Sequence, residues 1–297
     1  MLIARGIADA PAAMRFAERL LATCAEPFAL DDITTHVSVT VGVAMLDDAG
    51  TVNEGLRNAD LALYAAKAVR RGTARMFKAT MRTQALDRLA VETQLRAAMD
   101  RGELRLVYQP IVATHDGRVG GVEALMRWRS EELGDVTPGQ FIPVAERAGL
   151  IAGIGRFALS EAVRQLAAWR AQGHDRLNMG VNISALQLAD KDLPGFIGSL
   201  LAEHHVPPER LVLELTETGL MEHATSRPLE MLDRLSMVGV QLSLDDFGTG
   251  YSSLARLSRL RLAAAKIDRS FVTAMLNDPA TDAIVTLVVR MAELMGR

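Results

Sequence analysis

The pattern of apolar and polar positions divides the chain into three regions. In residues 1–78 the pattern predicts a helix at 9–21, a strand at 34–45, a helix at 52–69 and a short strand near 74–77. Residues 79–102 are polar and helical with a narrow apolar stripe, which indicates a helical linker packed on the next domain. In residues 103–297 short apolar strands alternate with amphipathic helices, so this region is predicted to be the main domain.

The main domain is predicted to contain six strands separated mostly by helices. The predicted strands are 104–112, 118–128, 177–184, 211–218, 241–246 and 263–268. Helices are predicted at 139–149, 154–173, 193–204, 228–238 and 252–260, with a last one at 282–295. This alternation favours a parallel sheet. Because no glycine-rich phosphate motif follows the first strand, an α/β fold of (β/α) barrel type is favoured over an open sheet.

Two adjacent carboxylates, Asp245 and Asp246, end the fifth strand just before Gly248 and Gly250. Consecutive strand residues point to opposite faces, so the two acids can share a site only where the backbone turns, and the glycines can supply that turn. A carboxylate pair at a strand end can hold metals in barrel enzymes. An isolated Asp-Asp pair before glycine, however, is more typical of a solvated turn.

Neighbouring strands carry polar groups of the same kind, and these change the interpretation. The residues are Glu123, Asn182, Glu214, Glu217, Lys266 and Asp268. Such groups inside apolar strands cost roughly 1–3 kcal/mol each if left unsatisfied. Together with Asp245 and Asp246, these groups occur on five successive strands, which predicts one shared site.

The donor set of this predicted site favours Mg²⁺ or Mn²⁺ over Zn²⁺, because it is rich in oxygen and contains no histidine. Single members have structural alternatives. Asn182 can bond a strand end, Glu217 can cap the following helix, and Lys266 can form a structural ion pair.

Composition excludes several other functions. The 297 residues are 49% hydrophobic and 23% charged, with net charge −3 and a pI near 6.1. This balance gives no basic field for a nucleic-acid polymer or an anionic membrane surface. Cys24 is the single cysteine, which excludes an internal disulfide and suits a reducing cytosol. The chain shows no signal peptide and no membrane-spanning run, so we expect a cytoplasmic domain, with any inner-membrane tether upstream of it.

Seven motifs in the main domain resemble those of the EAL family. They are YQPI (108–111), VEALMRW (122–128), FIPVAERAGLI (141–151), VNIS (181–184), ELTET (214–218), DDFGTGYSSL (245–254) and KIDRSFV (266–272). EAL proteins are phosphodiesterases that linearise cyclic di-GMP to pGpG. The resemblance therefore implies this reaction, a TIM-like barrel, cyclic di-GMP as ligand, and a homodimer through the EAL domain as one option.

The resemblance also assigns roles to individual residues. Glu123, Asn182, Glu214 and Asp245 would hold a first metal ion, and Asp246 would serve a second. Lys266 would orient the attacking water or offset charge on the phosphorane, and Glu217 would hold the loop at residues 246–251. Arg127 would contact a substrate phosphate, Gln109 would contact a guanine edge or a phosphate, and Asp268 is placed with the substrate-binding residues.

Residues 58–77, NADLALYAAKAVRRGTARMF, resemble the closing segment of the GGDEF diguanylate cyclase domain. Lys67 and Arg71 match that family's phosphate-contacting residues, although its usual GRN reads Arg71-Gly72-Thr73. Without the family, Lys67, Arg70 and Arg71 would be cations that complement a helix C-terminus. The signature GGDEF loop is absent, so no cyclase activity is expected.

The chain also departs from the EAL pattern, because it ends before the family's AEGVE strand, whose glutamate completes the site. We therefore expect a fragment of a tandem GGDEF–EAL protein, with a barrel incomplete at its C-terminus. Three alternatives follow: an active phosphodiesterase, a catalytically silent cyclic di-GMP receptor, or a chain without activity of its own. The intact metal ligands favour the enzyme. We expect hydrolysis by this chain at least about a hundredfold weaker than by an extended version.

Overall fold

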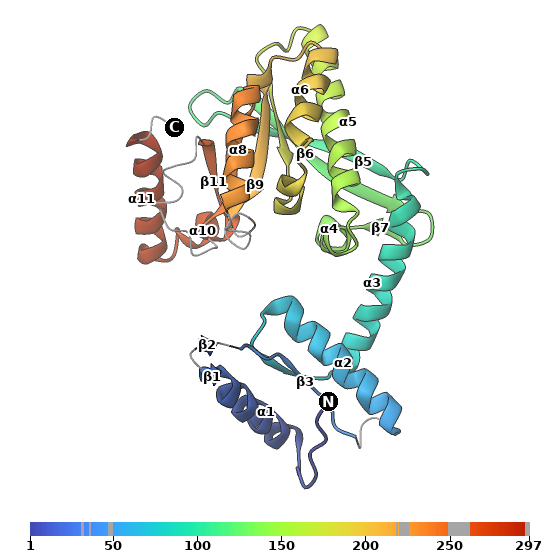
Figure 1. Ribbon diagram of the computed structural model, residues 1–297. Helices are drawn as coiled ribbons and strands as arrows, with labels where there is room; N and C mark the ends of the chain where they lie inside the picture. The colour runs from blue at the N-terminus through green and yellow to red at the C-terminus, as the bar shows by residue number, and fades with distance from the viewer. Residues whose placement is uncertain are drawn as a thin grey trace. The chain divides into compact units, whose positions relative to one another are not determined.

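The computed structural model describes residues 1–30, 33–35, 37–46, 50–217, 219, 226–248 and 262–294 (Figure 1). It divides into two compact units, Met1–Ala90 and Val91–Arg297, and the chain passes from one to the other within helix α3 (Ala79–Ala98). The predicted domain boundaries near residues 78 and 102 stay predictions. Among the described residues, no helix combines the length and apolarity needed to cross a membrane.

The first unit contains two long helices and two small pairs of strands. The elements are α1 (Ala10–Ala25), β1 (Phe28–Leu30), β2 (Ile33–Thr35), β3 (Val41–Val43), α2 (Val52–Val69) and β4 (Ala74–Met76). Both helices begin as their sequences predict. The Ala12 amide donates to Asp9 Oδ1 at 2.7 Å, and the Glu54 amide donates to Thr51 Oγ1 at 3.2 Å. These side chains satisfy amides that a helix N-terminus leaves unpaired.

The single strand predicted at residues 34–45 is wrong, because the structure has two separate short strands in this region and Val37 and Val39 lie in neither of them. β2 ends at Thr35 and pairs antiparallel with β1, whereas β3 begins at Val41 and pairs parallel with β4. Each partner is only three residues long, so no neighbouring strand extends over the whole valine run. Residues 47–49, between β3 and α2, lie outside the described residues.

Gly42 brings β3 into close contact with α2, since a Cβ there would lie 2.1 Å from Ala59 O and 2.2 Å from Leu63 N. Backbone atoms cannot move aside cheaply, so Gly42→Ala is expected to lower the free energy of unfolding of the first unit by about 1–3 kcal/mol. Urea unfolding measures this change. Gly139→Ala is the control because its Cβ would meet nothing within 4 Å. Equal stability of Gly42→Ala and wild type would contradict this packing.

The second unit is built on a sheet whose strand order is β11-β10-β9-β8-β6-β5, with β7 paired to β6. The strands are β5 (Leu104–Val112), β6 (Val119–Ser130), β7 (Gly134–Val136), β8 (Asn178–Asn182), β9 (Leu211–Thr216), β10 (Gln241–Phe247) and β11 (Leu262–Ile267). The pairs from β6 through β11 are parallel. In the described part of the chain, β5 and β11 form the two edges of the sheet.

The first strand departs from the predicted parallel arrangement, because β5 pairs antiparallel with β6. No helix separates the two strands, and the Ala113 amide donates to Arg118 O at 2.8 Å to close a hairpin. A short turn can only join antiparallel neighbours, since a parallel pair needs a crossover of a dozen or more residues. The prediction of a parallel sheet therefore holds for the path β6-β8-β9-β10-β11, while the short β7 pairs antiparallel with β6.

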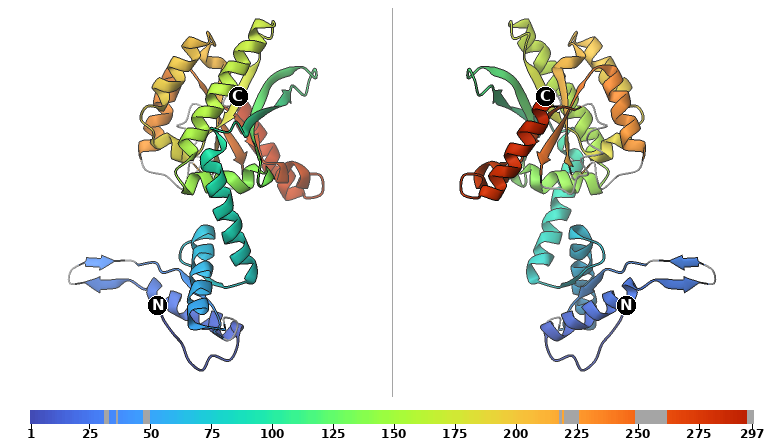
Figure 2. Two further views of the ribbon diagram at one scale, coloured as in Figure 1. Left: turned by 90° about the vertical axis from the view of Figure 1, so that its right-hand side faces the viewer. Right: turned by 90° about the vertical axis from the view of Figure 1, so that its left-hand side faces the viewer.

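Helices α5 (Ile151–Ala171), α6 (Leu193–Glu203) and α8 (Ser226–Val238) pack on one face of this sheet (Figures 1 and 2). Helix α4 (Pro138–Arg147) packs with the end of α3, β6 and β7 in a second apolar cluster. The unit also contains α10 (Arg269–Ala274), α11 (Pro279–Leu294) and the 3₁₀ turns η1 (Ala185–Ala189) and η2 (Pro208–Arg210). The helix predicted at 252–260 lies outside the described residues. The sequence pattern did not reveal β7, α10, η1 and η2, all of which are six residues or shorter.

The alternation within each strand decides which face the helices cover. In β9, Leu211, Leu213 and Leu215 are buried in the main core with residues of α5, α6 and α8. The residues between them, Val212, Glu214 and Thr216, therefore point to the other face of the sheet. That second face is called the site face below.

Candidate active site

The predicted polar residues of the strands gather on the site face. Register pairing sets Glu123 of β6 between Gln109 of β5 and Gly180 of β8, and Asn182 of β8 beside Glu214 of β9. Residues paired in register on neighbouring strands point to the same face. Their outward neighbours, such as Val122, Val181 and Leu213, are buried under helices. The sheet thus directs apolar residues into the core and polar ones into one site.

Three carboxylates, those of Glu123, Glu214 and Asp245, form the centre of this site. Each offers one oxygen, and these oxygens all lie within 4.8 Å of one another. Glu214 is only 2% exposed, whereas Glu123 and Asp245 are half-buried. Three carboxylate oxygens at this spacing can hold a divalent cation, and the hard oxygen donors suit Mg²⁺ or Mn²⁺.

Lys266 of β11 supplies a positive charge inside the cluster. Its Nζ donates to Glu123 Oε2 at 2.7 Å and to Glu214 Oε2 at 2.5 Å. On the other side, Asn182 Nδ2 donates to Glu123 Oε1 at 2.8 Å. The ion pair that sequence reasoning left open for Lys266 therefore exists, and it lies within the candidate site.

Two opposing effects set the pKa values of Glu123, Glu214 and Lys266: burial disfavours their charged forms, and the hydrogen bonds and ion pairs among them favour those forms. Burial raises the pKa of Glu214 to about 7, helped by the charges of Glu123 and Asp245 and opposed by Lys266. Burial would also raise the pKa of Glu123, but hydrogen bonds from Lys266 and Asn182 outweigh it and hold this pKa below its usual value. Burial would lower the pKa of Lys266, but its bonds to the two glutamates raise it. Lys266 therefore stays charged.

Asp246 differs from Asp245 in conformation and in partners. Its φ of 53° is left-handed, and its amide donates to Asp245 Oδ1 at 3.0 Å. The turn that separates the two acids thus begins at Asp246 itself, before the glycines to which the sequence pointed. Burial raises the pKa of Asp246, and the charges of Asp245 and Asp268 and a hydrogen bond with Asp268 raise it further.

The remaining predicted residues lie around the cluster. Glu217, 1% exposed, accepts a hydrogen bond from the Gly248 amide at 2.8 Å through Oε2. Asp268 caps α10 through the Ser270 amide at 2.9 Å, and the bonds from Ser270 hold the Asp268 pKa below its usual value. Gln109 is exposed on β5, and Arg127 Nη1 donates to Met126 O at 2.8 Å. The assigned roles of these four residues stay predictions.

Gly180 contributes to the site although sequence reasoning did not single it out. A Cβ at this position would lie 2.4 Å from Glu214 Oε1, so the missing side chain leaves the space that the Glu214 carboxylate occupies. A glycine inside a strand marks the close approach of another group, and this is the signal that the sequence contained.

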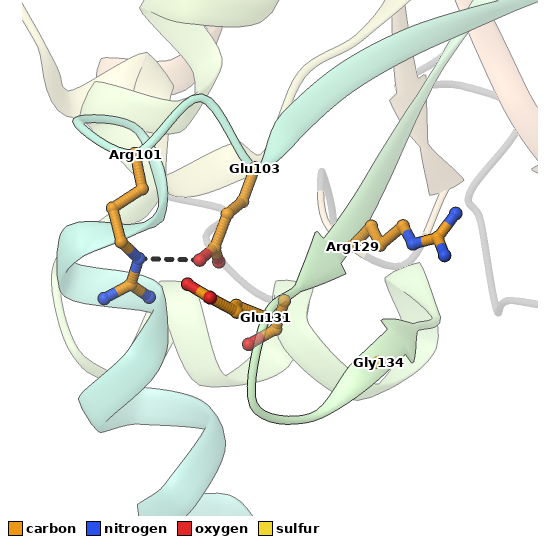
Figure 3. Close-up of a pocket in the computed structure, with 6 residues that line it drawn as sticks. Arg101, Glu103, Arg129, Glu131 and Gly134 are labelled. Atoms are coloured by element: carbon orange, nitrogen blue, oxygen red, sulfur yellow. Dashed lines mark hydrogen bonds and ion pairs between the residues drawn. The ribbon is translucent and has the colours of Figure 1, made fainter.

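A separate cavity of about 460 Å³ lies at the β6–β7 turn (Figure 3). It is lined by Arg101, Glu103, Arg129, Ser130, Glu131 and Gly134. Arg101 Nε donates to Glu103 Oε1 at 2.6 Å, so the strongest charges at its wall neutralise each other. It contains none of the predicted site residues.

An α/β domain of barrel type with a carboxylate cluster on parallel strands is a class of domain suited to metal-dependent phosphoryl chemistry. The EAL domain family model matches residues 92–297, and the chain belongs to this family. Residues 1–73 match the diguanylate cyclase GGDEF domain. The predicted family, order of domains and barrel-type fold class are thereby confirmed.

Curated relatives resemble the chain over most of its length. It is 39% identical over 297 residues to the bifunctional diguanylate cyclase/cyclic di-GMP phosphodiesterase MucR of Pseudomonas aeruginosa, covering all of this chain and 43% of MucR. It is 37% identical over 281 residues to the cyclic di-GMP phosphodiesterase PdeR of Escherichia coli, covering 94% of this chain and 42% of PdeR. The chain therefore spans less than half the length of these two relatives.

Solved structures of EAL proteins resemble the second unit. The PaMucR phosphodiesterase in complex with c-di-GMP has a TM-score of 0.66 and 43% identity, covering 70% of this chain and 83% of that one. The FimX EAL domain from Pseudomonas aeruginosa bound to c-di-GMP has a TM-score of 0.61 and 25% identity, covering 70% and 82%.

Proposed function

We propose that this protein hydrolyses cyclic di-GMP to linear pGpG with the help of Mg²⁺ or Mn²⁺. The observation that carries the proposal is the cluster of Glu123, Glu214 and Asp245, which brings three carboxylates within reach of one cation. The phosphodiesterase names of the relatives and the c-di-GMP bound in the solved complexes support the choice of substrate. No cyclase activity is included in the proposal.

Metal binding is assigned to residues of four strands. Glu123, Glu214 and Asp245 would hold a first cation, joined by Asn182, whose Nδ2 is used by Glu123 and whose Oδ1 remains for metal. Asp246 would hold a second cation. Divalent ions bound by these residues would supply Lewis-acid activation of a water molecule and would offset the negative charge that develops during displacement at phosphorus.

The other residues orient groups or bind substrate. Lys266, whose charge is kept by its two glutamate partners, would orient the attacking water or offset negative charge on the phosphate. Glu217 would hold the turn after β10 through the Gly248 amide. Arg127 would contact a phosphate of the substrate, and Gln109 would contact a guanine edge or a phosphate. Asp268 is assigned to the substrate side because it lies beside Asp246.

The test is an assay of the purified chain with cyclic di-GMP and Mg²⁺, then Mn²⁺, then Ca²⁺. Linear pGpG that appears with Mg²⁺ or Mn²⁺ and disappears on chelation supports the enzyme. Tight binding of cyclic di-GMP without product identifies a silent receptor instead. A cytoplasmic location and a homodimer through the EAL domain belong to the same proposal, and they rest on the sequence and the family.

A further inference from the structure

Two arginines face each other across the β5–β6 hairpin. Arg105 of β5 is in register with Arg127 of β6, and the ladder has no shift between Leu104 and Ile111. Four residues further along β5, Gln109 is in register with Glu123, whose side chain reaches Lys266 on the site face. Because side chains alternate with a period of two, Arg105 and Arg127 lie on that face too.

No acid in the described part of the chain forms an ion pair with either arginine. Glu103, which directly precedes β5, already accepts hydrogen bonds from Arg101 (Figure 3) and from Trp128 Nε1 at 2.9 Å. Arg129, two residues beyond Arg127, points away from the Arg101–Glu103 pair in Figure 3, and it is in register with an acid, Asp135 of β7.

Like charges directly opposite each other destabilise a strand pair. Arg105 is exposed, so water solvates its charge when no ligand is bound, but the register places the two positive charges opposite each other. Such a pair attracts anions, and guanidinium groups bind phosphate oxygens through two parallel hydrogen bonds. The hairpin therefore offers two anion-binding side chains on the same face as Glu123, four residues along each strand from the Gln109–Glu123 pair.

We propose that Arg105, together with Arg127, binds the phosphodiester of cyclic di-GMP that is not held at the carboxylate cluster. This inference rests on the proposed function. Cyclic di-GMP contains two phosphodiesters, each with one negative charge. Cations at Glu123, Glu214 and Asp245 can offset one of them, and the second requires positive charge from the protein. Arg105 supplies that charge as a binding residue and takes no part in the chemical step.

The test compares Arg105→Gln with wild type in two assays of the full chain. Calorimetric titration with cyclic di-GMP, with Ca²⁺ in place of Mg²⁺, is expected to show binding about tenfold weaker in the variant at low salt. The difference should shrink as ionic strength rises. Hydrolysis of bis-para-nitrophenyl phosphate with Mn²⁺ should change less than twofold, because this diester has one phosphate only. Arg105→Lys should recover part of the affinity.

Arg118→Gln is the matched control, since Arg118 lies at the turn of the same hairpin with its side chain 84% exposed. Equal affinity of wild type and Arg105→Gln would overturn the inference and leave the proposed function standing. An equal loss in both assays would also overturn it, because Arg105 would then act through the metal centre or the fold. A wild-type chain that neither binds nor hydrolyses cyclic di-GMP would overturn the proposed function and this inference together.

Discussion

Replacing Glu123 with glutamine is expected to slow cyclic di-GMP hydrolysis by at least about a hundredfold. Glutamine keeps the length of the side chain and an oxygen that can accept the bond from Asn182 Nδ2. It removes one of the three negative charges of the cluster and the charged partner of Lys266. Loss of groups that merely orient metal ligands costs about 10–100-fold, so loss of a charged ligand should cost more.

The measurement is the rate of pGpG formation at saturating Mn²⁺, together with the affinity for Mn²⁺. Glu203→Gln is the matched control, because Glu203 is exposed at the end of α6 and is not one of the three carboxylates of the cluster. Thermal melting checks that both variants fold. A Glu123→Gln variant that keeps more than a tenth of the wild-type rate would contradict the assignment of Glu123 as a ligand.

Lys266→Met is expected to lower both stability and activity. Removing the ammonium leaves Glu123 and the buried Glu214 without their cation, and breaking such a buried pair costs about 3–5 kcal/mol. The loss in the free energy of unfolding should be about 3 kcal/mol or less, since Glu214, with a pKa of about 7, can take up a proton. Hydrolysis should fall about a hundredfold, as expected when a group that positions the attacking water is lost.

Thermal melting with and without Mn²⁺ separates these two effects. A cation bound at the carboxylates would replace the missing positive charge, so Mn²⁺ should raise the melting temperature of Lys266→Met more than that of wild type. Lys191→Met serves as the control, because Lys191 is exposed, lies between η1 and α6, and forms no ion pair within the described part of the chain. Unchanged melting and unchanged activity in Lys266→Met would refute both roles.

The sequence was sufficient to predict the strands that form the site. Alternation defined β9 and β10 within two residues at each end, because one face of each strand is buried under helices and the other is polar. Polar residues at corresponding places on successive strands then predicted that Glu123, Glu214 and Asp245 meet, as the structure shows.

Strand direction and the close packing of individual side chains were harder to predict from the sequence. The antiparallel direction of β5 follows from a short turn and not from the alternation of the strands that it joins. The valine run at residues 37–43 has the right period for one strand, but it lacks a partner of sufficient length. The space above Gly180 depends on the rotamer of Glu214, which no local pattern specifies.

The left-handed backbone at Asp246 limits which amino acids this position can accept. Asparagine, aspartate and glycine adopt a φ near 53° readily, whereas β-branched residues do so only with strain. A substitution at this position must therefore meet two requirements: the new residue must adopt the left-handed backbone, and it must carry the negative charge of Asp246. Asparagine adopts the left-handed backbone but carries no charge. Asp246→Asn therefore keeps the conformation of the turn while removing the carboxylate.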